Sequence, residues 1–147
     1  MDEPDYDDPE VEEAWCLAER QRVIDYLATQ PIEYNEVGEW PAWFVPPIVA
    51  IWAIESAVEP NAIGYWAISG DLPTDFISGY RVVHPREAMA AFADQWDDVA
   101  DHMERKVPHP EFVLGRESNW HELAPLLRAR AKIFREWVAD DDLWEDE

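Results

Sequence analysis

A stretch rich in Trp, Pro and Gly, residues 37–76, constrains the fold of this chain more than any other. It holds four of the nine Trp and five of the twelve Pro. Within it, two apolar segments repeat the triplet Trp-Ala-Ile, at residues 52–54 and 66–68. Short continuous apolar runs are typical of strands that are buried on both faces. Because Glu59, Pro60 and Asn61 between them favour a turn, we expect an antiparallel hairpin.

Cross-strand pairing predicts the register of this hairpin. We expect Trp52 opposite Ile68 and Ile54 opposite Trp66, because aromatic–aliphatic pairs each contribute roughly 0.2–1 kcal/mol. A slip by one residue would place each Trp opposite an Ala. In the expected register the loops before and after the hairpin meet at its open end.

Helical patterns flank the hairpin on both sides. Asp8 followed by Pro9 is typical of a helix start, and apolar residues recur at helical spacing to about residue 29. A second helix is expected after Pro85, because Met89, Phe92, Trp96, Val99 and Met103 form one apolar seam. A third helix is expected from about residue 125 to residue 139, preceded by Asn119 and Glu122, which resemble a capping box.

The order of these elements predicts the fold class. A third short strand is expected within residues 76–83, at 80–83. Helix, two or three strands, helix and helix together predict an α+β fold, in which about three helices pack on a small antiparallel sheet. At 147 residues a single domain is expected, over 9–139, between a mobile acidic tail at 1–8 and a second acidic tail at 140–147.

The charge of the chain limits its partners. The formal net charge is -22, of which the 13 N-terminal residues contribute -8 and the last eight contribute -6. A nucleic acid or an anionic membrane would be repelled, because binding either requires clustered Lys and Arg. A basic protein partner is favoured, since opposite fields accelerate encounter.

Several sequence features indicate a cytoplasmic protein. Cys16 is the single cysteine and permits no internal disulfide. No signal peptide is recognisable, and the longest apolar run is interrupted by Pro46 and Pro47. Without a basic neighbour to activate it, Cys16 is expected to be a packed residue rather than a nucleophile.

The open end of the hairpin is the candidate binding site. The expected register gathers six residues there: Glu39, Trp40, Trp43, Asp71, Thr74 and Asp75. Aromatic faces and carboxylates together suit a cationic group, and this interpretation requires that Trp40 or Trp43 be partly exposed. Alternatively, the Trp side chains belong to the core and the Asp side chains cap turns.

The sequence offers little support for catalysis or metal binding. Asp71 could act with Asp75 or Glu39 in acid–base chemistry, but no nucleophile with a neighbouring base is apparent, so we expect no catalytic residues. The four His residues form no ligand pair, and no metal or other cofactor is expected.

A basic stripe on the last helix allows a further alternative. Arg128, Lys132 and Arg135 share one stripe and Arg130 is nearby, which is most simply a solvated face. The stripe could instead hold an acidic tail of the same chain or of a second copy, which would make the protein a homodimer.

Four phrases resemble a bacterial family of unknown function, domain of unknown function 4826. They are Gly-Glu-Trp-Pro-Ala-Trp at 38–43, Ile-Trp-Ala-Ile-Glu-Ser at 51–56, Ile-Ser-Gly-Asp-Leu-Pro-Thr-Asp at 68–75 and His-Pro-Arg-Glu-Ala at 84–88. The resemblance implies a small cytoplasmic bacterial protein and carries no established activity or site residues.

Two functions from different classes therefore remain open. The first is a non-enzymatic acidic binding protein, such as an inhibitor or immunity protein that covers a basic partner. The alternative is a small enzyme or ligand-binding domain that uses the carboxylates and Trp at the end of the hairpin. A structural subunit would instead show a broad apolar patch outside the core.

Overall fold

The computed structural model describes residues 6–71, 74–80, 82–106 and 120–144. They belong to two compact units, Met1–Ala88 and Met89–Glu147. The helices are α1 (Pro9–Leu27), α2 (Pro85–Glu104), α3 (Trp120–Val138) and the short 3-10 helix η2 (Asp141–Trp144). The strands are β1 (Tyr34–Val37), β2 (Trp43–Val45), β3 (Val49–Ser56), β4 (Ile63–Gly70) and β5 (Asp75–Ser78).

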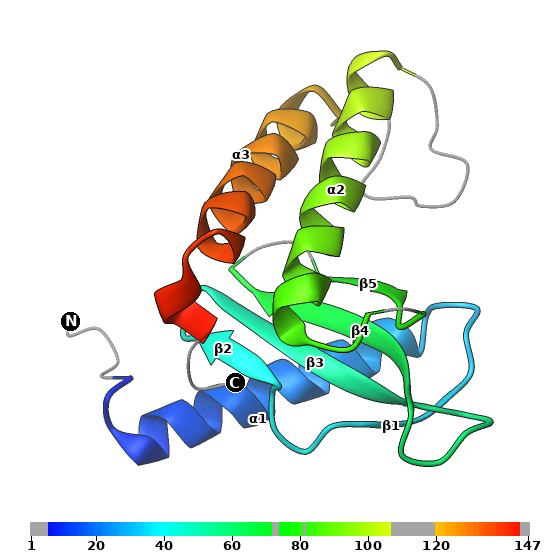
Figure 1. Cartoon of the computed structure of the whole chain (residues 1–147), viewed down its shortest axis with the longest axis vertical. Coiled ribbons are helices and arrows are strands. Elements are labelled where there is room, and N and C mark those ends of the chain that lie inside the picture. The colour runs from blue at the N-terminus through cyan, green and yellow to red at the C-terminus, as the bar shows by residue number, and fades with distance from the viewer. Residues whose placement is uncertain (1–5, 72–73, 81, 107–119, 145–147) are drawn as a thin grey trace. The chain divides into compact units, whose positions relative to one another are not determined.

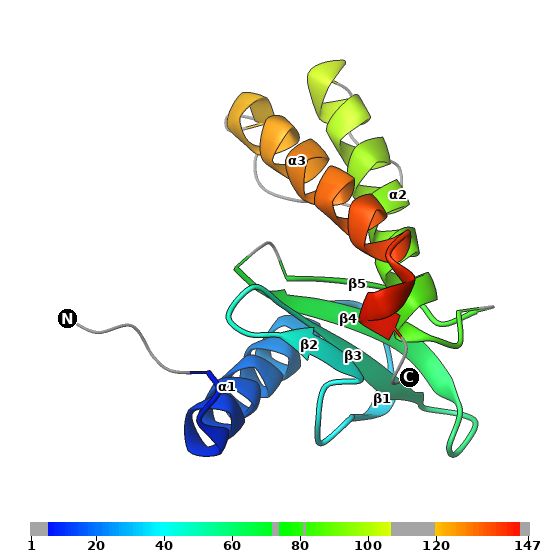
Figure 2. The ribbon, with the colours of Figure 1, turned by 60° about the vertical axis from the view of Figure 1, so that its left-hand side comes forward.

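The first unit consists of an antiparallel sheet with α1 against one face (Figure 1, Figure 2). The five strands have the order β1-β3-β4-β5, and β2 pairs with β3. β1 and β2 share one edge of β3, since Val37 lies opposite Ile54 and Val45 lies opposite Val49. Five antiparallel strands and three α-helices confirm the predicted α+β class.

α1 begins where the sequence predicts. The Asp8 side chain caps the helix by accepting a hydrogen bond from the Glu10 amide at 2.9 Å, and Pro9 occupies the first position. Val23 and Leu27 on this helix are fully buried against Trp52 and other residues of the sheet. α1 is therefore held mainly by this packing, as is usual for helices in proteins.

The hairpin of β3 and β4 is present, but its predicted register is wrong by one residue. Trp52 lies opposite Ala67, and Ala53 lies opposite Trp66. Consequently the two Trp side chains lie on opposite faces of the sheet, whereas the sequence placed them on one face. Both are almost completely buried.

A buried hydrogen bond explains why this register is preferred. The Trp52 indole Nε1 donates to Ser69 Oγ at 3.1 Å, which requires both side chains on the same face. In the predicted register Ser69 would lie on the other face and the buried indole N–H would lose this acceptor. An unsatisfied buried donor costs about 1–3 kcal/mol, more than an aromatic–aliphatic pair contributes.

Three short strands were missed or misplaced by the sequence interpretation. β1 lies in a segment for which no element was predicted. β2 lies in the Pro-rich segment 38–47, which was expected to be a loop because prolines disfavour regular structure. Pro46 and Pro47, joined by a cis peptide bond, form the turn between β2 and β3. The third strand expected at 80–83 is instead β5, and Tyr80 and Val83 are 75% and 76% exposed.

In the second unit, α2 and α3 pack side by side (Figure 1). All five residues of the predicted α2 seam are buried, and Trp96 packs on Phe134 with ring centroids 5.4 Å apart. α3 begins at Trp120, before Pro125, so the predicted start at Pro125 is wrong. Asn119 lies outside the described residues.

The basic stripe of α3 faces the acidic residues of α2. Arg135 pairs with Asp94 and Asp97, and Arg128 pairs with Glu104, with Nε and Oε1 2.5 Å apart. Both arginine side chains stay partly exposed, as in the interpretation of a solvated face, and their ion pairs are with acidic residues of α2. Such exposed pairs contribute roughly 0–1 kcal/mol each, so they orient the helices more than they stabilise them.

Part of the predicted C-terminal acidic tail has defined structure. Residues 141–144 form η2, and Trp144 is 5% exposed. Its indole Nε1 donates to the Trp137 carbonyl at 2.9 Å, which ties η2 to the end of α3. Residues 1–5 and 145–147 are outside the description, so the extent of the tails stays a prediction.

Candidate functional site

The two loops that were predicted to meet at the open end of the hairpin do lie close together. The Asp71 amide donates to the Ile48 carbonyl at 3.0 Å, and the Asp71 side chain is exposed. Thr74 is half-buried and follows residues 72–73, which are outside the described residues. These residues form the end of the hairpin, as expected.

Trp43 and Asp75, however, lie on opposite sides of the central strand pair. Trp43 is opposite Ile51, Ile51 is opposite Ile68, and Ile68 is opposite Asp75 in a single cross-strand row. Neighbouring strands are about 4.8 Å apart, so three steps separate these two backbones by roughly 14 Å. Trp43 is 8% exposed and Asp75 is 3% exposed, so neither presents a binding surface.

Asp75 has a structural partner instead. Its Oδ1 accepts hydrogen bonds from the Phe76 amide at 2.8 Å and from the Tyr26 hydroxyl at 3.4 Å. Burial, followed by the charge and hydrogen bond of Asp75, raises the pKa of Tyr26 well above its usual range. This contact links α1 to β5, so the Asp75 side chain is engaged in the packing of these two elements.

Glu39 and Trp40 lie in a different place, beside α1. Because Pro46 and Pro47 turn the chain back along β3, the Gly38 amide donates to the Ala53 carbonyl at 3.0 Å, well away from the open end. A shallow cavity of about 380 Å³ is lined there by five residues. We call these residues the Trp40 patch: Glu13, Leu17, Arg20, Glu39 and Trp40.

The Trp40 patch meets the requirement for exposure, since Trp40 is 44% exposed and Leu17 is 55% exposed. Arg20 fixes its geometry: Nε donates to the Gly38 carbonyl and Nη2 to the Val37 carbonyl, both at 2.9 Å. These bonds hold the backbone that carries Glu39 and Trp40 against α1.

Three members of the Trp40 patch were not recognised from sequence. Glu13, Leu17 and Arg20 have the spacing i, i+4 and i+7, which places them on one face of a helix. This signal was available in the sequence. The sequence does not reveal that this face contacts residues 38–40, because the contact depends on the turn between β2 and β3.

Two polar residues of α1 are buried but not part of an open site. Glu19 is 4% exposed, and its Oε1 lies 3.6 Å from Nη1 of Arg22, which donates to the Gly70 carbonyl at 3.1 Å. Cys16 is also buried. Burial, and then the charges of Glu12 and Glu19, raise the pKa of the Cys16 thiol to about 11. Cys16 is therefore a poor nucleophile, as the sequence predicts.

We expect the Cys16 thiol to react with Ellman's reagent at pH 8 at least about 100-fold more slowly in the native protein than in urea. With a pKa of about 11 only about one thiol in a thousand is ionised at this pH, and burial blocks access as well. Because Cys16 is the only cysteine, the released chromophore reports this site alone. Equal rates in the native protein and in urea would contradict the assignment of Cys16 as a buried thiol with a raised pKa.

The same pKa shift fixes the sign of its effect on stability. The unfolded thiol titrates near pH 8.5 and the folded thiol near 11. The protonated thiol therefore makes its full contribution to the free energy of unfolding below about pH 8.5. This contribution is lost as the pH rises towards 11.

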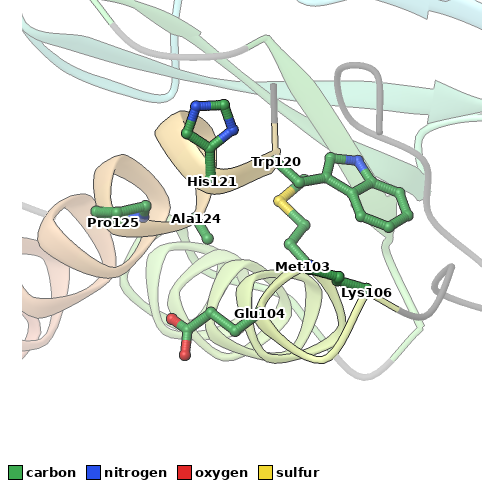
Figure 3. Close-up of a pocket in the computed structure, with 7 residues that line it drawn as sticks. All are labelled: Met103, Glu104, Lys106, Trp120, His121, Ala124 and Pro125. Atoms are coloured by element: carbon green, nitrogen blue, oxygen red, sulfur yellow. The ribbon is translucent and has the colours of Figure 1, made fainter. Parts of the chain in front are cut away.

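Figure 3 shows a larger cavity in the second unit, of about 670 Å³, where Met103 reaches toward Trp120. Lys106 and Trp120 border residues 107–119, which the structure does not describe, so we build no site on this cavity. Within the described ranges, no three His, Cys, Asp or Glu residues are grouped as metal ligands. No helix in the same ranges combines the length and apolar character of a membrane span.

The fold and the site define a small α+β protein with an antiparallel sheet and an exposed aromatic patch flanked by carboxylates. Residues 10–144 match the family described as Domain of unknown function (DUF4826), and the chain belongs to this family. This confirms the family resemblance seen in the sequence. No curated protein and no solved structure matches the chain.

Proposed function

We propose that this protein is a non-enzymatic binding protein whose acidic surface covers a basic protein partner, as an inhibitor or immunity-type protein does. The observation that carries this proposal is the way its few basic residues are used. The chain has 33 acidic and 11 basic residues, and the described arginines point largely to internal partners.

Five arginines illustrate this use. Arg20 and Arg22 donate to backbone carbonyls, and Arg105, Arg128 and Arg135 pair with acidic residues of α2. Arg105, Arg128 and Arg135 neutralise carboxylates of α2 and leave the acidic excess elsewhere on the surface. Such a field accelerates encounter with a basic protein and weakens with salt.

The alternative, an enzyme or ligand site at the end of the hairpin, has less support. Its six candidate residues divide among the open end of the hairpin, the two sides of the sheet and the Trp40 patch. Asp75 is engaged by Phe76 and Tyr26. We further propose that binding takes place in the cytoplasm, where a single buried thiol without a disulfide remains reduced.

The proposal is tested by affinity capture from the lysate of the source organism at low and high salt, followed by binding kinetics with the purified partner. We expect one stoichiometric basic protein, with an association rate that falls steeply as salt increases. Recovery of no basic protein at either salt concentration would refute the proposal.

Charge variants sharpen this experiment. Glu33, Glu59 and Glu136 are exposed and have no ion pair among the described residues. Changing all three to Gln should reduce the association rate several-fold and flatten its salt dependence. Changing the same three to Asp keeps the charge and is the matched control, for which the rate should stay near that of the wild type.

A further inference from the structure

We propose that the Trp40 patch receives an arginine side chain of the partner, with the guanidinium on the Trp40 indole and paired with Glu13 and Glu39. This inference rests on the proposed function and specifies the chemistry of one contact. It depends on three features of the patch: a supported aromatic face, carboxylates without cations, and an internal arginine that is already bound.

The Trp40 ring is supported from within the protein and open on the outside. Phe44 contacts it edge-to-face, with centroids 5.8 Å apart, and Phe44 itself stacks on Trp15 at 6.2 Å. With 44% of its surface exposed, Trp40 still offers area to a partner. Trp is the aromatic side chain best suited to bind a cation over its face.

The carboxylates of the patch lack a cation of their own. Glu13 and Glu39 are exposed, and neither has an ion pair or hydrogen bond to its side chain within the described ranges. Arg20, the basic residue of the patch, donates its Nε and Nη2 to the Gly38 and Val37 carbonyls. The patch therefore carries two carboxylates against one guanidinium, whose Nε and Nη2 are already bound, and this acidic excess beside an indole favours an external cation.

The shape of the patch suits arginine better than lysine. A guanidinium is planar, stacks on an indole, and can donate to two carboxylates at once, whereas an ammonium is compact and strongly hydrated. Leu17, at the same cavity, offers apolar contact for the methylene stem of the incoming side chain. A volume of about 380 Å³ is large enough to admit an arginine side chain.

Titration with N-acetyl-arginine amide tests the site directly. In spectra of protein labelled with 15N, the Trp40 indole N–H and the Glu39 amide should shift with saturation at millimolar ligand. N-acetyl-lysine amide should bind at least about fivefold more weakly. Equal shifts with both amides, or shifts spread evenly over all Trp indoles, would overturn the proposal.

Variants separate stacking from charge. Trp40→Ala, followed through the Glu39 amide, should abolish saturable binding, and Glu13→Gln with Glu39→Gln should weaken it at least about fivefold. Glu33→Gln with Glu59→Gln changes the net charge equally, at exposed positions of the first unit outside the patch, and should leave binding within about twofold. Unchanged binding in either patch variant would refute the site.

The same variants distinguish this inference from the proposed function. If Trp40→Ala binds the captured basic partner with wild-type affinity, the arginine site is wrong while the binding function stands. If no basic partner is captured but arginine amide binds selectively at Trp40, the proposed function is wrong and the site stands.

Discussion

Replacing Gly70 with Ala is expected to lower the free energy of unfolding by about 3 kcal/mol or more. Gly70 has φ of +128°, a conformation that is open to glycine and strained for other residues. An added Cβ would lie 2.3 Å from the Ile48 carbonyl oxygen and 2.8 Å from Val49 Cα. Both neighbours are backbone atoms, so a side-chain rotation cannot relieve the overlap.

The surroundings of Gly70 prevent the backbone from moving away. The Asp71 amide is bound to the Ile48 carbonyl, and the Gly70 carbonyl accepts a hydrogen bond from Arg22 at 3.1 Å. Any shift that accommodates a Cβ must weaken the end of the β3–β4 hairpin or its link to α1. The cost therefore combines strain with lost hydrogen bonds.

Urea unfolding measures this effect, and Gly38→Ala is the matched control. At Gly38 an added Cβ would meet carbonyl oxygens of Ala53 and Trp40 at 3.3 Å, a tight contact that small shifts relieve. We expect this control to cost about 1 kcal/mol or less. Equal losses for the two variants would show that the conformation of Gly70 is not the cause.

Replacing Trp52 with Ala is expected to destabilise the protein by about 3–5 kcal/mol. Trp52 is fully buried, packs in the core between α1 and the sheet, and donates to Ser69 Oγ. Truncation leaves a cavity and removes a satisfied buried donor. Ser69→Ala keeps the indole but removes its acceptor, and should cost about 1–3 kcal/mol.

A double-mutant cycle makes the same position a test of the register. Ala67 lies opposite Trp52, so Ala67→Trp alone overpacks this site. In the double variant, Trp52→Ala with Ala67→Trp, the pair of one large and one small side chain is restored. The double variant should lose less free energy of unfolding than the two single variants lose together, by about 1 kcal/mol or more. Additive losses of free energy in the two single variants would contradict the pairing of Trp52 with Ala67.

The sequence was sufficient for the elements that depend on local chemistry. Asp8 and Pro9 defined the start of α1, and the spacing of Met89, Phe92, Trp96, Val99 and Met103 defined the buried face of α2. Caps and helical periodicity act within a few residues, so a single sequence expresses them fully. Together with the Trp-Ala-Ile repeat they were enough to predict an α+β fold.

The candidate site was only partly predictable. Partial exposure of Trp40 or Trp43 was expected, and Trp40 is exposed. The loops on either side of the hairpin were expected to meet, and the Asp71 amide is bound to the Ile48 carbonyl. The convergence of Trp43 with Asp75 was also expected, but it is absent because β2 and β5 lie on opposite sides of the β3–β4 pair. Strand order depends on contacts between distant segments, which loop sequences do not reveal.

The sequence by itself determined the fold class, the acidic character and most of two helices of this protein. Only the tertiary structure decided the register of the hairpin and the partners of each Trp. A one-residue slip leaves composition and local propensity unchanged but moves every side chain to the other face of the sheet. The buried environment selects between the two registers. It supplies a donor at Trp52, an acceptor at Ser69, and the small side chain of Ala67 opposite a large indole.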